Sequence, residues 1–261
     1  MTLVMPTRVL VVGSGGREHA LAWKLAAEPG INEVIVAPGS AAMTDEDRVR
    51  VLPGANPLDP PSIVDAARAA AAELVVIGPE APLAAGVADA LVEAGIPVFG
   101  PSRAAARLET SKAFCHEIAA AAGVPMARAR SFMPGEGAAA EAFIRELARG
   151  GARAVMKADG LAGGKGVIVC DSPEQAIGLV PGFLAGRSPD APALVVEERL
   201  AGHEASVIAI CDGTRAVALP VARDHKRLCD DDLGPNTGGM GAYSPLPDLD
   251  DDDVEIGRAH V

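Results

Sequence analysis

The sequence is poor in aromatic residues and in net positive charge, and each scarcity narrows what the chain can do. Aromatic residues make up 3% of its 261 residues, so the core must be built from aliphatic side chains and alanine. The formal net charge is −12. This argues against a general surface for nucleic acids or anionic membranes, because both need clustered positive charge. A phosphate ligand would have to be held locally, by backbone N–H groups and a few lysines.

Disulfide pairs and long apolar runs are also missing. The four cysteines, Cys115, Cys170, Cys211 and Cys229, form no C-x-x-C pair, so no disulfide framework is expected. The sequence has no run of 18 uncharged apolar residues, and residues 1–12 lack the apolar core of a signal peptide. We therefore expect a soluble, cytoplasmic protein.

The C-terminal end carries a different signal. Residues 255–261, Glu-Ile-Gly-Arg-Ala-His-Val, match the translation of a common sequencing-adapter read-through (GAG ATC GGA AGA GCA CAC GTC). We expect these residues to be a non-native tail, with genuine sequence ending near Val254, and exclude them from the fold prediction.

Residues 1–106 alternate short apolar runs with helical patterns. The runs predict strands at 8–12, 34–36, 74–77 and 96–99, and the patterns predict helices at 19–27, 61–72 and 83–94. Strands that alternate with helices and are apolar throughout indicate a parallel sheet covered on both faces. We therefore predict an N-terminal α/β domain.

After residue 106 the pattern changes to α+β. It predicts helices at 111–122, at 138–149 and from Glu174, and strands at 154–158, 167–170, 194–197, 204–211 and 216–221. The dipeptide Asp212-Gly213 favours a hairpin between the last two strands. We predict a second domain over residues 107–254 with antiparallel pairing.

The segment Gly13-Ser-Gly-Gly-Arg-Glu18 follows a predicted strand and opens a helix. Free N–H groups and the helix dipole at such a turn can hold a phosphate. A dinucleotide-binding fingerprint needs glycine where Glu18 stands and an acidic residue after the second strand, where Ala37-Pro-Gly39 offers none. NAD is therefore disfavoured, and a tight turn without a ligand stays the alternative.

A second glycine segment, Lys157-Ala-Asp-Gly-Leu-Ala-Gly-Gly-Lys-Gly-Val167, is not a Walker loop. Lys165 occupies the place of the second glycine, no Ser or Thr follows, and the next element is a strand. The segment is either a hairpin that covers nucleotide phosphates or a flexible surface hairpin. Lys157 favours the first interpretation, because a charge within an apolar strand is costly unless an anion pairs with it.

Three later segments are weak signals separately. They are the acidic turn Glu197–Glu204, the basic run Asp224–Arg227 and the glycine-rich stretch Gly234–Ser244. The turn could offer backbone groups to adenine and a carboxylate to ribose, and the stretch could approach a small polar ligand closely. A solvated turn and a disordered loop are the ordinary alternatives. His19 and His225 have no partner at metal-ligand spacing, and no G-x-S-x-G elbow is present.

Together and in order, these segments resemble the phosphoribosylamine–glycine ligase family of ATP-grasp enzymes. The matching segments, within residues 8–245, are GSGGREHAL, ETSKAF, KADGLAGGKGV, VVEERLAGHEAS, DHKR and GPNTGGMGAYSP. The resemblance implies ATP-dependent ligation of glycine to 5-phosphoribosylamine through glycyl phosphate, in purine biosynthesis. It also implies ATP with Mg²⁺ or Mn²⁺, a lid at about residues 125–195, a monomer when full length, and neither nucleic acid nor membrane as partner.

The resemblance gives individual residues a role. Those implied to bind ATP are Lys112, Lys157, Gly160, Gly163, Gly164, Lys165, Gly166, Glu197, Glu198, Leu200 and Glu204. Those implied to bind the phosphoribosyl substrate are Gly15, Gly16 and Arg17 at its phosphate and Glu80 at its sugar. Those implied to surround the reaction centre are Asp224, Lys226, Arg227, Asn236, Thr237 and Gly238.

The sequence departs from the family pattern in three places. Ser40-Ala-Ala42 stands where Asn-Ala-Gly is usual, and Arg199 stands where the hinge usually has an aromatic residue. The Glu-x-Asn metal segment and the C-terminal domain would follow residue 261. We therefore expect an incomplete ATP-grasp domain, no metal ligand in this chain and no activity from the chain alone. Another ATP-grasp ligase or carboxylase, or a non-catalytic nucleotide-binding module, stays an alternative.

Overall fold

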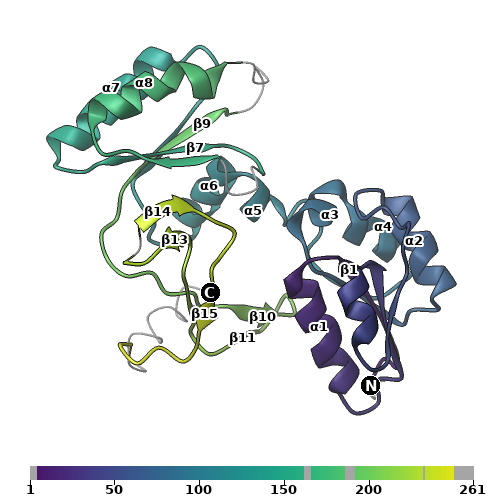
Figure 1. Cartoon of the computed structure of the whole chain (residues 1–261). Coiled ribbons are helices and arrows are strands. Elements are labelled where there is room, and N and C mark those ends of the chain that lie inside the picture. Colours follow the sequence, from purple (N-terminus) through teal and green to yellow (C-terminus); the bar gives the residue numbers. More distant parts are fainter. Residues whose placement is uncertain (1–4, 162–165, 186–191, 232, 250–261) are drawn as a thin grey trace. The chain divides into compact units, whose positions relative to one another are not determined.

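The computed structural model describes residues 5–161, 166–185, 192–231 and 233–249. The chain divides into two compact units, Met1–Cys115 and His116–Val261, and each unit has its own sheets (Figure 1). No helix among the described residues is long and apolar enough to cross a membrane. The expected tail, residues 255–261, lies outside the described residues.

A five-stranded parallel sheet, in the order β3-β2-β1-β4-β5, forms the centre of the first unit. Its strands are β1 (Arg8–Gly13), β2 (Glu33–Pro38), β3 (Val49–Val51), β4 (Leu74–Ile77) and β5 (Val98–Phe99). Val9 and Val11 pack against α1 (Gly16–Ala27) on one face. Leu10 and Val12 face the opposite side, where α2 (Pro60–Ala69) and α4 (Val87–Glu93) cover the sheet. The prediction of a parallel sheet covered on both faces is confirmed.

The helix predicted over residues 83–94 was wrong in one respect. The structure has two helices there, α3 (Glu80–Ala85) and α4. Gly86 lies between them with φ of 90°, a left-handed conformation that ends α3 and that glycine adopts without steric cost. The short elements η1 (Ala41–Asp45), β3 and α5 (Arg107–Thr110) were not predicted. Three to five residues are too few to show a hydrophobic period.

Gly13 and Gly78 lie at the carboxyl ends of β1 and β4 and leave room for the side chain of Glu18. A Cβ atom on Gly78 would lie 2.5 Å from Cγ of Glu18, whereas a Cβ atom on Gly16 would meet nothing within 4 Å. We expect Gly78→Ala to lower the free energy of unfolding by about 1–3 kcal/mol, and Gly16→Ala to change it by less than about 0.5 kcal/mol. Urea unfolding followed through Trp23, the single tryptophan, measures both. Equal losses would contradict this account.

The second unit begins with a four-stranded antiparallel sheet in the order β6-β9-β7-β8. Its strands are β6 (Ala129–Phe132), β7 (Ala154–Ala158), β8 (Val167–Val169) and β9 (Leu194–Glu198). The helices α7 (Gly137–Arg149) and α8 (Pro173–Leu184) pack against this sheet and against each other (Figure 1). The helix α6 (Lys112–Ala122) precedes β6.

Short antiparallel pairs make up the rest of the second unit. They are β10 (Ala209–Cys211) with β11 (Ala216–Ala218), β12 (Arg223–Asp224) with β15 (Ala242–Tyr243), and β13 (Arg227–Cys229) with β14 (Leu233–Asn236). The hairpin predicted at Asp212-Gly213 is present. Its strands are shorter than predicted, because Pro220 has no N–H to donate and the ladder beyond it continues only as the isolated bridge of Ser206 with Ala222.

Candidate functional site

The glycine turn before α1 brings together the four residues predicted to bind the phosphoribosyl substrate. Gly15 is the N-cap of α1, and Gly16 and Arg17 are its first two residues. The N–H groups of a first helical turn have no partner within the helix. The guanidinium of Arg17 lies 3.4 Å from the carboxylate of Glu80, the first residue of α3.

Glu18 organises this turn, although the sequence analysis gave it no role. Its Oε2 accepts the N–H of Gly15 at 2.9 Å, and its Oε1 accepts Nε of Arg17 at 3.1 Å. Burial by itself lowers the pKa of Arg17, but the hydrogen bond and charge of Glu18, together with Glu80, outweigh burial and raise it. The arginine therefore stays charged, as an anion site requires.

Lys157 on β7 and Glu197 on β9 form an ion pair, with Nζ 2.5 Å from Oε2. The other oxygen of Glu197 lies 3.0 Å from Nε2 of His116 on α6. Glu197 is buried and its two partners are mostly so. The charge of Lys157 in an apolar strand favours the phosphate-covering hairpin only if no protein anion pairs with it; Glu197 is such an anion, so the charge alone does not distinguish the two interpretations. His116, four residues after Lys112 on the same helix, was not predicted.

The hinge residues that follow are fixed by the neighbouring strand. The carboxylate of Glu198 accepts the N–H of Arg128 at 2.8 Å, and the N–H of Glu198 donates to the carbonyl of Arg128 at 2.9 Å. The side chain of Leu200 is exposed. The backbone at Glu198 is thus fixed by Arg128, whereas the side chain of Leu200 is exposed to solvent.

Three side chains predicted for the ATP site and the reaction centre meet in one cluster. Nζ of Lys226 lies 2.7 Å from Oε2 of Glu204 and 2.9 Å from Oδ1 of Asp224. The hydrogen bonds that Lys226 donates to Glu204 and then to Asp224 raise the pKa of Lys226, and the second of them lowers the pKa of Asp224. Lys226 and Asp224 therefore stay charged at neutral pH, and the ammonium lies between two carboxylates.

The basic run and the glycine-rich stretch, both predicted to surround the reaction centre, pair with each other. Thr237 donates to the carbonyl of Lys226 through its N–H at 2.7 Å and through Oγ1 at 3.0 Å. Arg227 pairs with Asn236 in the β13–β14 ladder, and its guanidinium donates to the carbonyl of Gly234 at 2.6 Å. Gly238 is exposed in the turn that follows. The predicted reaction-centre residues are thus brought together.

Other predicted residues are described only in part. Gly160 and Gly166 frame the glycine hairpin, where the carbonyl of Gly166 accepts the N–H of Ala158 at 2.7 Å. Gly163, Gly164 and Lys165 lie outside the described residues. Lys112 is the first residue of α6.

An ion pair with two contacts joins Arg223 and Asp248 beside the paired strands β12 and β15. The guanidinium of Arg223 contacts the two oxygens of Asp248 at 3.1 and 2.9 Å and donates to the hydroxyl of Tyr243 at 3.1 Å. The hydrogen bond from Arg223 lowers the pKa of Asp248. A lowered pKa in the folded state means that this contact is fully present above the ordinary carboxyl pKa and is lost as the pH falls through the folded value.

We therefore expect the ring NMR signals of Tyr243, the single tyrosine, to stay constant from neutral pH down to about pH 4.5 and to change below about pH 3.9. Asp248→Asn should give the low-pH signals already at neutral pH. A low-pH change of the Tyr243 signals that persists in Asp248→Asn would come from a group other than this ion pair.

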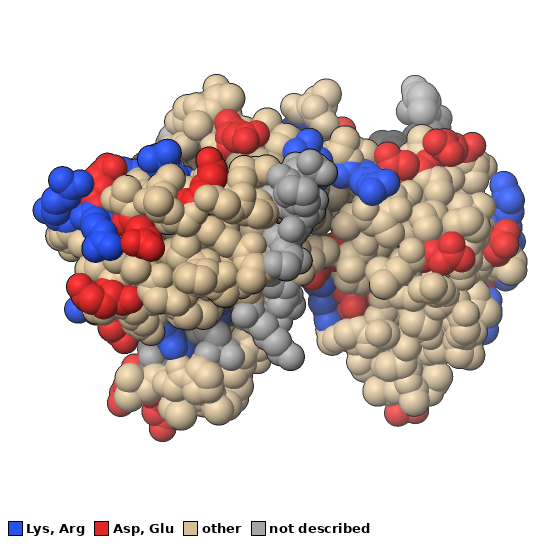
Figure 2. All heavy atoms as spheres, turned by 90° about the horizontal axis from the view of Figure 1, so that it is seen from above, with Lys and Arg blue, Asp and Glu red and all other residues tan. Residues whose placement is uncertain are grey.

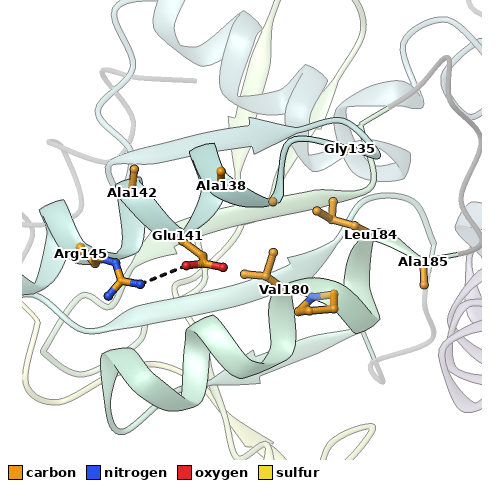
Figure 3. A pocket seen from close by; sticks show the side chains of 10 residues that line it. Gly135, Ala138, Glu141, Ala142, Arg145, Val180, Leu184 and Ala185 are labelled. Carbon is orange, nitrogen blue, oxygen red and sulfur yellow. Dashed lines mark hydrogen bonds and ion pairs between the residues drawn. The ribbon is translucent and has the colours of Figure 1, made fainter.

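A groove of about 620 Å³ lies on α7 and α8 (Figure 3). Gly135, Ala138, Glu141, Arg145, Val180 and Leu184 are among its lining residues, and no predicted site residue lines it. Within the described part of the chain, no three His, Cys, Asp or Glu side chains form a group that could hold a metal ion. On the face drawn in Figure 2, acidic and basic side chains of the described residues are interspersed.

The β6-β9-β7-β8 sheet with α7 and α8 packed on it is that of an ATP-grasp domain. A family model described as the phosphoribosylglycinamide synthetase ATP-grasp (A) domain matches residues 110–261, and the model of the N domain matches residues 7–109. The chain belongs to the phosphoribosylglycinamide synthetase family.

Relatives named phosphoribosylamine–glycine ligase agree with this assignment. The protein of Ralstonia nicotianae is 49% identical over 92% of this chain and 56% of its own length, and that of Rhizobium meliloti is 48% identical over 95% and 57%. The chain thus spans about half the length of these relatives. A solved phosphoribosylamine–glycine ligase from Thermotoga maritima has a TM-score of 0.76 and 34% identity, covering 97% of this chain and 59% of that one.

Proposed function

We propose that this chain supplies the N domain and part of the ATP-grasp domain of an enzyme that joins glycine to 5-phosphoribosylamine. The observation that carries the proposal is the match of both family models, in order, over nearly the whole chain. Structures of other ATP-grasp enzymes, such as a biotin carboxylase domain at 21% identity, share the fold alone.

The reaction would proceed in two transfers. The carboxylate of glycine attacks the γ-phosphorus of ATP, and the bond to ADP breaks, which gives glycyl phosphate. The amine of phosphoribosylamine then attacks the glycyl carbonyl, loses a proton and expels phosphate, leaving glycinamide ribonucleotide. Positioning and neutralisation of charge would supply most of the rate. ATP would enter as its Mg²⁺ or Mn²⁺ complex, and the ion would neutralise negative charge on the phosphates.

Different residues would bind phosphoribosylamine, bind ATP and surround the transferred phosphoryl group. The N–H groups of Gly16 and Arg17 would hold the 5-phosphate, and Glu80 the sugar. Lys157, Lys112 and the glycine hairpin would hold the phosphates of ATP, with the hinge at Glu198 and Leu200 on adenine and Glu204 on ribose. The cluster around Lys226 and the loop at Thr237 would surround the transferred phosphoryl group. We also infer a cytoplasmic enzyme, monomeric when full length.

A chimaera tests this function directly. The matched segment of the Ralstonia nicotianae relative is replaced by this chain, and the product is expressed in bacteria that lack phosphoribosylamine–glycine ligase. We expect growth without added purine, and formation of ADP that depends on both glycine and phosphoribosylamine. Nucleotide binding without such turnover would favour a non-catalytic module, and turnover with another acceptor would favour a different ATP-grasp ligase. The chain alone, assayed in parallel, tests the prediction that it is inactive.

A further inference from the structure

Glu18 is one of two charged residues that are buried among those the structure describes, at 3% exposure. A buried carboxylate is costly unless hydrogen bonds and opposite charge compensate for its lost hydration. The N–H of Gly15 and the guanidinium of Arg17, which both donate to Glu18, belong to the N-terminal turn of α1. The carboxylate therefore holds this turn from inside the protein.

Two glycines make the space that this side chain occupies. Cβ atoms on Gly13 and Gly78 would both lie 2.5 Å from Cγ of Glu18, closer than real Cβ contacts. Gly13 and Gly78 end neighbouring strands, since the N–H of Gly78 donates to the carbonyl of Val12 at 3.1 Å. The strand ends thus form a slot that fixes the direction of the Glu18 carboxylate.

The slot also fixes Arg17. Its side chain is 61% exposed, and an arginine so exposed would ordinarily sample many rotamers. Here Nε is bound by Glu18 at 3.1 Å and Nη2 lies 3.4 Å from Glu80, so the guanidinium is restrained from two sides beside the start of α1.

We propose that Glu18 is a positioning residue of the phosphate subsite. Its carboxylate accepts the N–H of Gly15 and orients the guanidinium of Arg17. The N–H groups of Gly16 and Arg17 and the remaining guanidinium donors are then directed toward one phosphate. This inference rests on the proposed function, because it takes the 5-phosphate of the substrate to bind at the start of α1.

Phosphate binding becomes weaker without the charge of Glu18 if this residue positions the site, and stronger if the residue acts only by charge repulsion. A carboxylate near a bound phosphate repels it, so removing the charge of Glu18 would strengthen phosphate binding if charge were its whole influence. Loss of positioning weakens binding instead. Glu18→Gln, which keeps the shape of the side chain, therefore gives opposite results under the two accounts.

The experiment measures the Kd of the chain for ribose 5-phosphate by calorimetry, with Glu18→Gln in both the wild-type and the Arg17→Ala backgrounds. We expect about tenfold weaker binding in the first and less than about twofold change in the second, because glutamine can still accept the N–H of Gly15 and the contact that is lost is the one with Arg17. Glu28→Gln is the matched control. It removes the same charge at the far end of α1, where Glu28 pairs with Lys24, and should leave Kd within about twofold.

Tighter binding in Glu18→Gln, or equal losses in both backgrounds, would overturn the role of Glu18. A wild-type chain that binds no ribose 5-phosphate would overturn the phosphate subsite as well, whereas the proposed ligase function stands or falls on growth of the chimaera. If Glu18→Gln does not fold, Gly78→Ala replaces it. That variant displaces the side chain of Glu18 without removing its charge, and unchanged binding would likewise overturn the proposal.

Discussion

Replacing Lys157 by alanine is expected to weaken binding of MgATP by about 10- to 150-fold. This range corresponds to the roughly 1.5–3 kcal/mol that a hydrogen bond to a charged group contributes. Lys157 lies on β7, next to the glycine segment that begins after Ala158, and its side chain is 25% exposed. An amine in this position can reach a phosphate while it keeps its contact with Glu197.

The same substitution also leaves Glu197 without its cation. Glu197 is buried, and removing one partner of a buried ion pair destabilises a protein because the remaining charge is uncompensated. Weaker ATP binding could then arise from a loosened sheet instead of a lost phosphate contact. The double variant Lys157→Ala/Glu197→Gln separates these effects, since it removes both charges.

We expect the double variant to regain most of the thermal stability lost in Lys157→Ala, and to stay weak in ATP binding. Calorimetric titration with MgATP and a thermal melt of each variant provide both readouts. Arg145→Ala is a suitable control, because it breaks an exposed pair with Glu141 on the outer helix α7. Recovery of ATP affinity in the double variant would show that Lys157 acts on the sheet alone.

Most of the fold could be predicted because its signals are local. The strand at residues 8–12 is a continuous apolar run and the helix at 138–149 shows its period within a dozen residues, and alternating strands and helices leave few topologies. Two of the errors occurred where one residue decides the outcome. Gly86 divides a helix by adopting a positive φ, and Pro220 shortens a hairpin by lacking one N–H.

The composition of the site was predictable only to the extent that its residues form sequence motifs. Lys157 and Glu197 were both named, but their ion pair was not, because it depends on the register of β7 with β9. Glu18 was noted only as the residue that excludes a dinucleotide fingerprint. Its buried position follows from two glycines at the ends of separate strands.

His116 illustrates the same limit. Nothing within α6 marks this histidine as different from a surface residue, and its contact with Glu197 joins residues 81 positions apart. The charge of Glu197 in an apolar strand is a usable signal, because a buried carboxylate needs partners that compensate its charge. Lys157 carries the same signal: its charge in an apolar strand indicates an anion nearby, and that anion is Glu197.

Replacing Lys226 by methionine is expected to lower kcat of the chimaeric enzyme by about 10²- to 10³-fold, the usual effect of removing one donor that stabilises developing charge. Methionine keeps the length of the side chain and leaves the carbonyl of residue 226 in place to accept the two hydrogen bonds from Thr237. The variant therefore removes the ammonium and preserves the backbone of the loop. It also leaves Glu204 and Asp224 as two carboxylates without the cation between them.

Kinetics can distinguish a role in phosphoryl transfer from a role in holding ATP. If Lys226 neutralises charge that develops during transfer, kcat falls while KM for ATP changes by less than about threefold. Arg215→Met serves as the matched control, since Arg215 is an exposed cation next to β11 in the same unit. Its kcat should stay within about twofold of the parent.

The pH dependence gives an independent check on the charge of Lys226. Glu204 and Asp224 raise the pKa of Lys226 above its ordinary value, so the ammonium is fully present below about pH 10.4 and is lost only above that. The parent enzyme should therefore show no loss of kcat from this group between about pH 7 and 9. An activity that falls over that range in the parent, and not in Lys226→Met, would mean that Lys226 releases its proton during the reaction and acts as a general acid–base group instead.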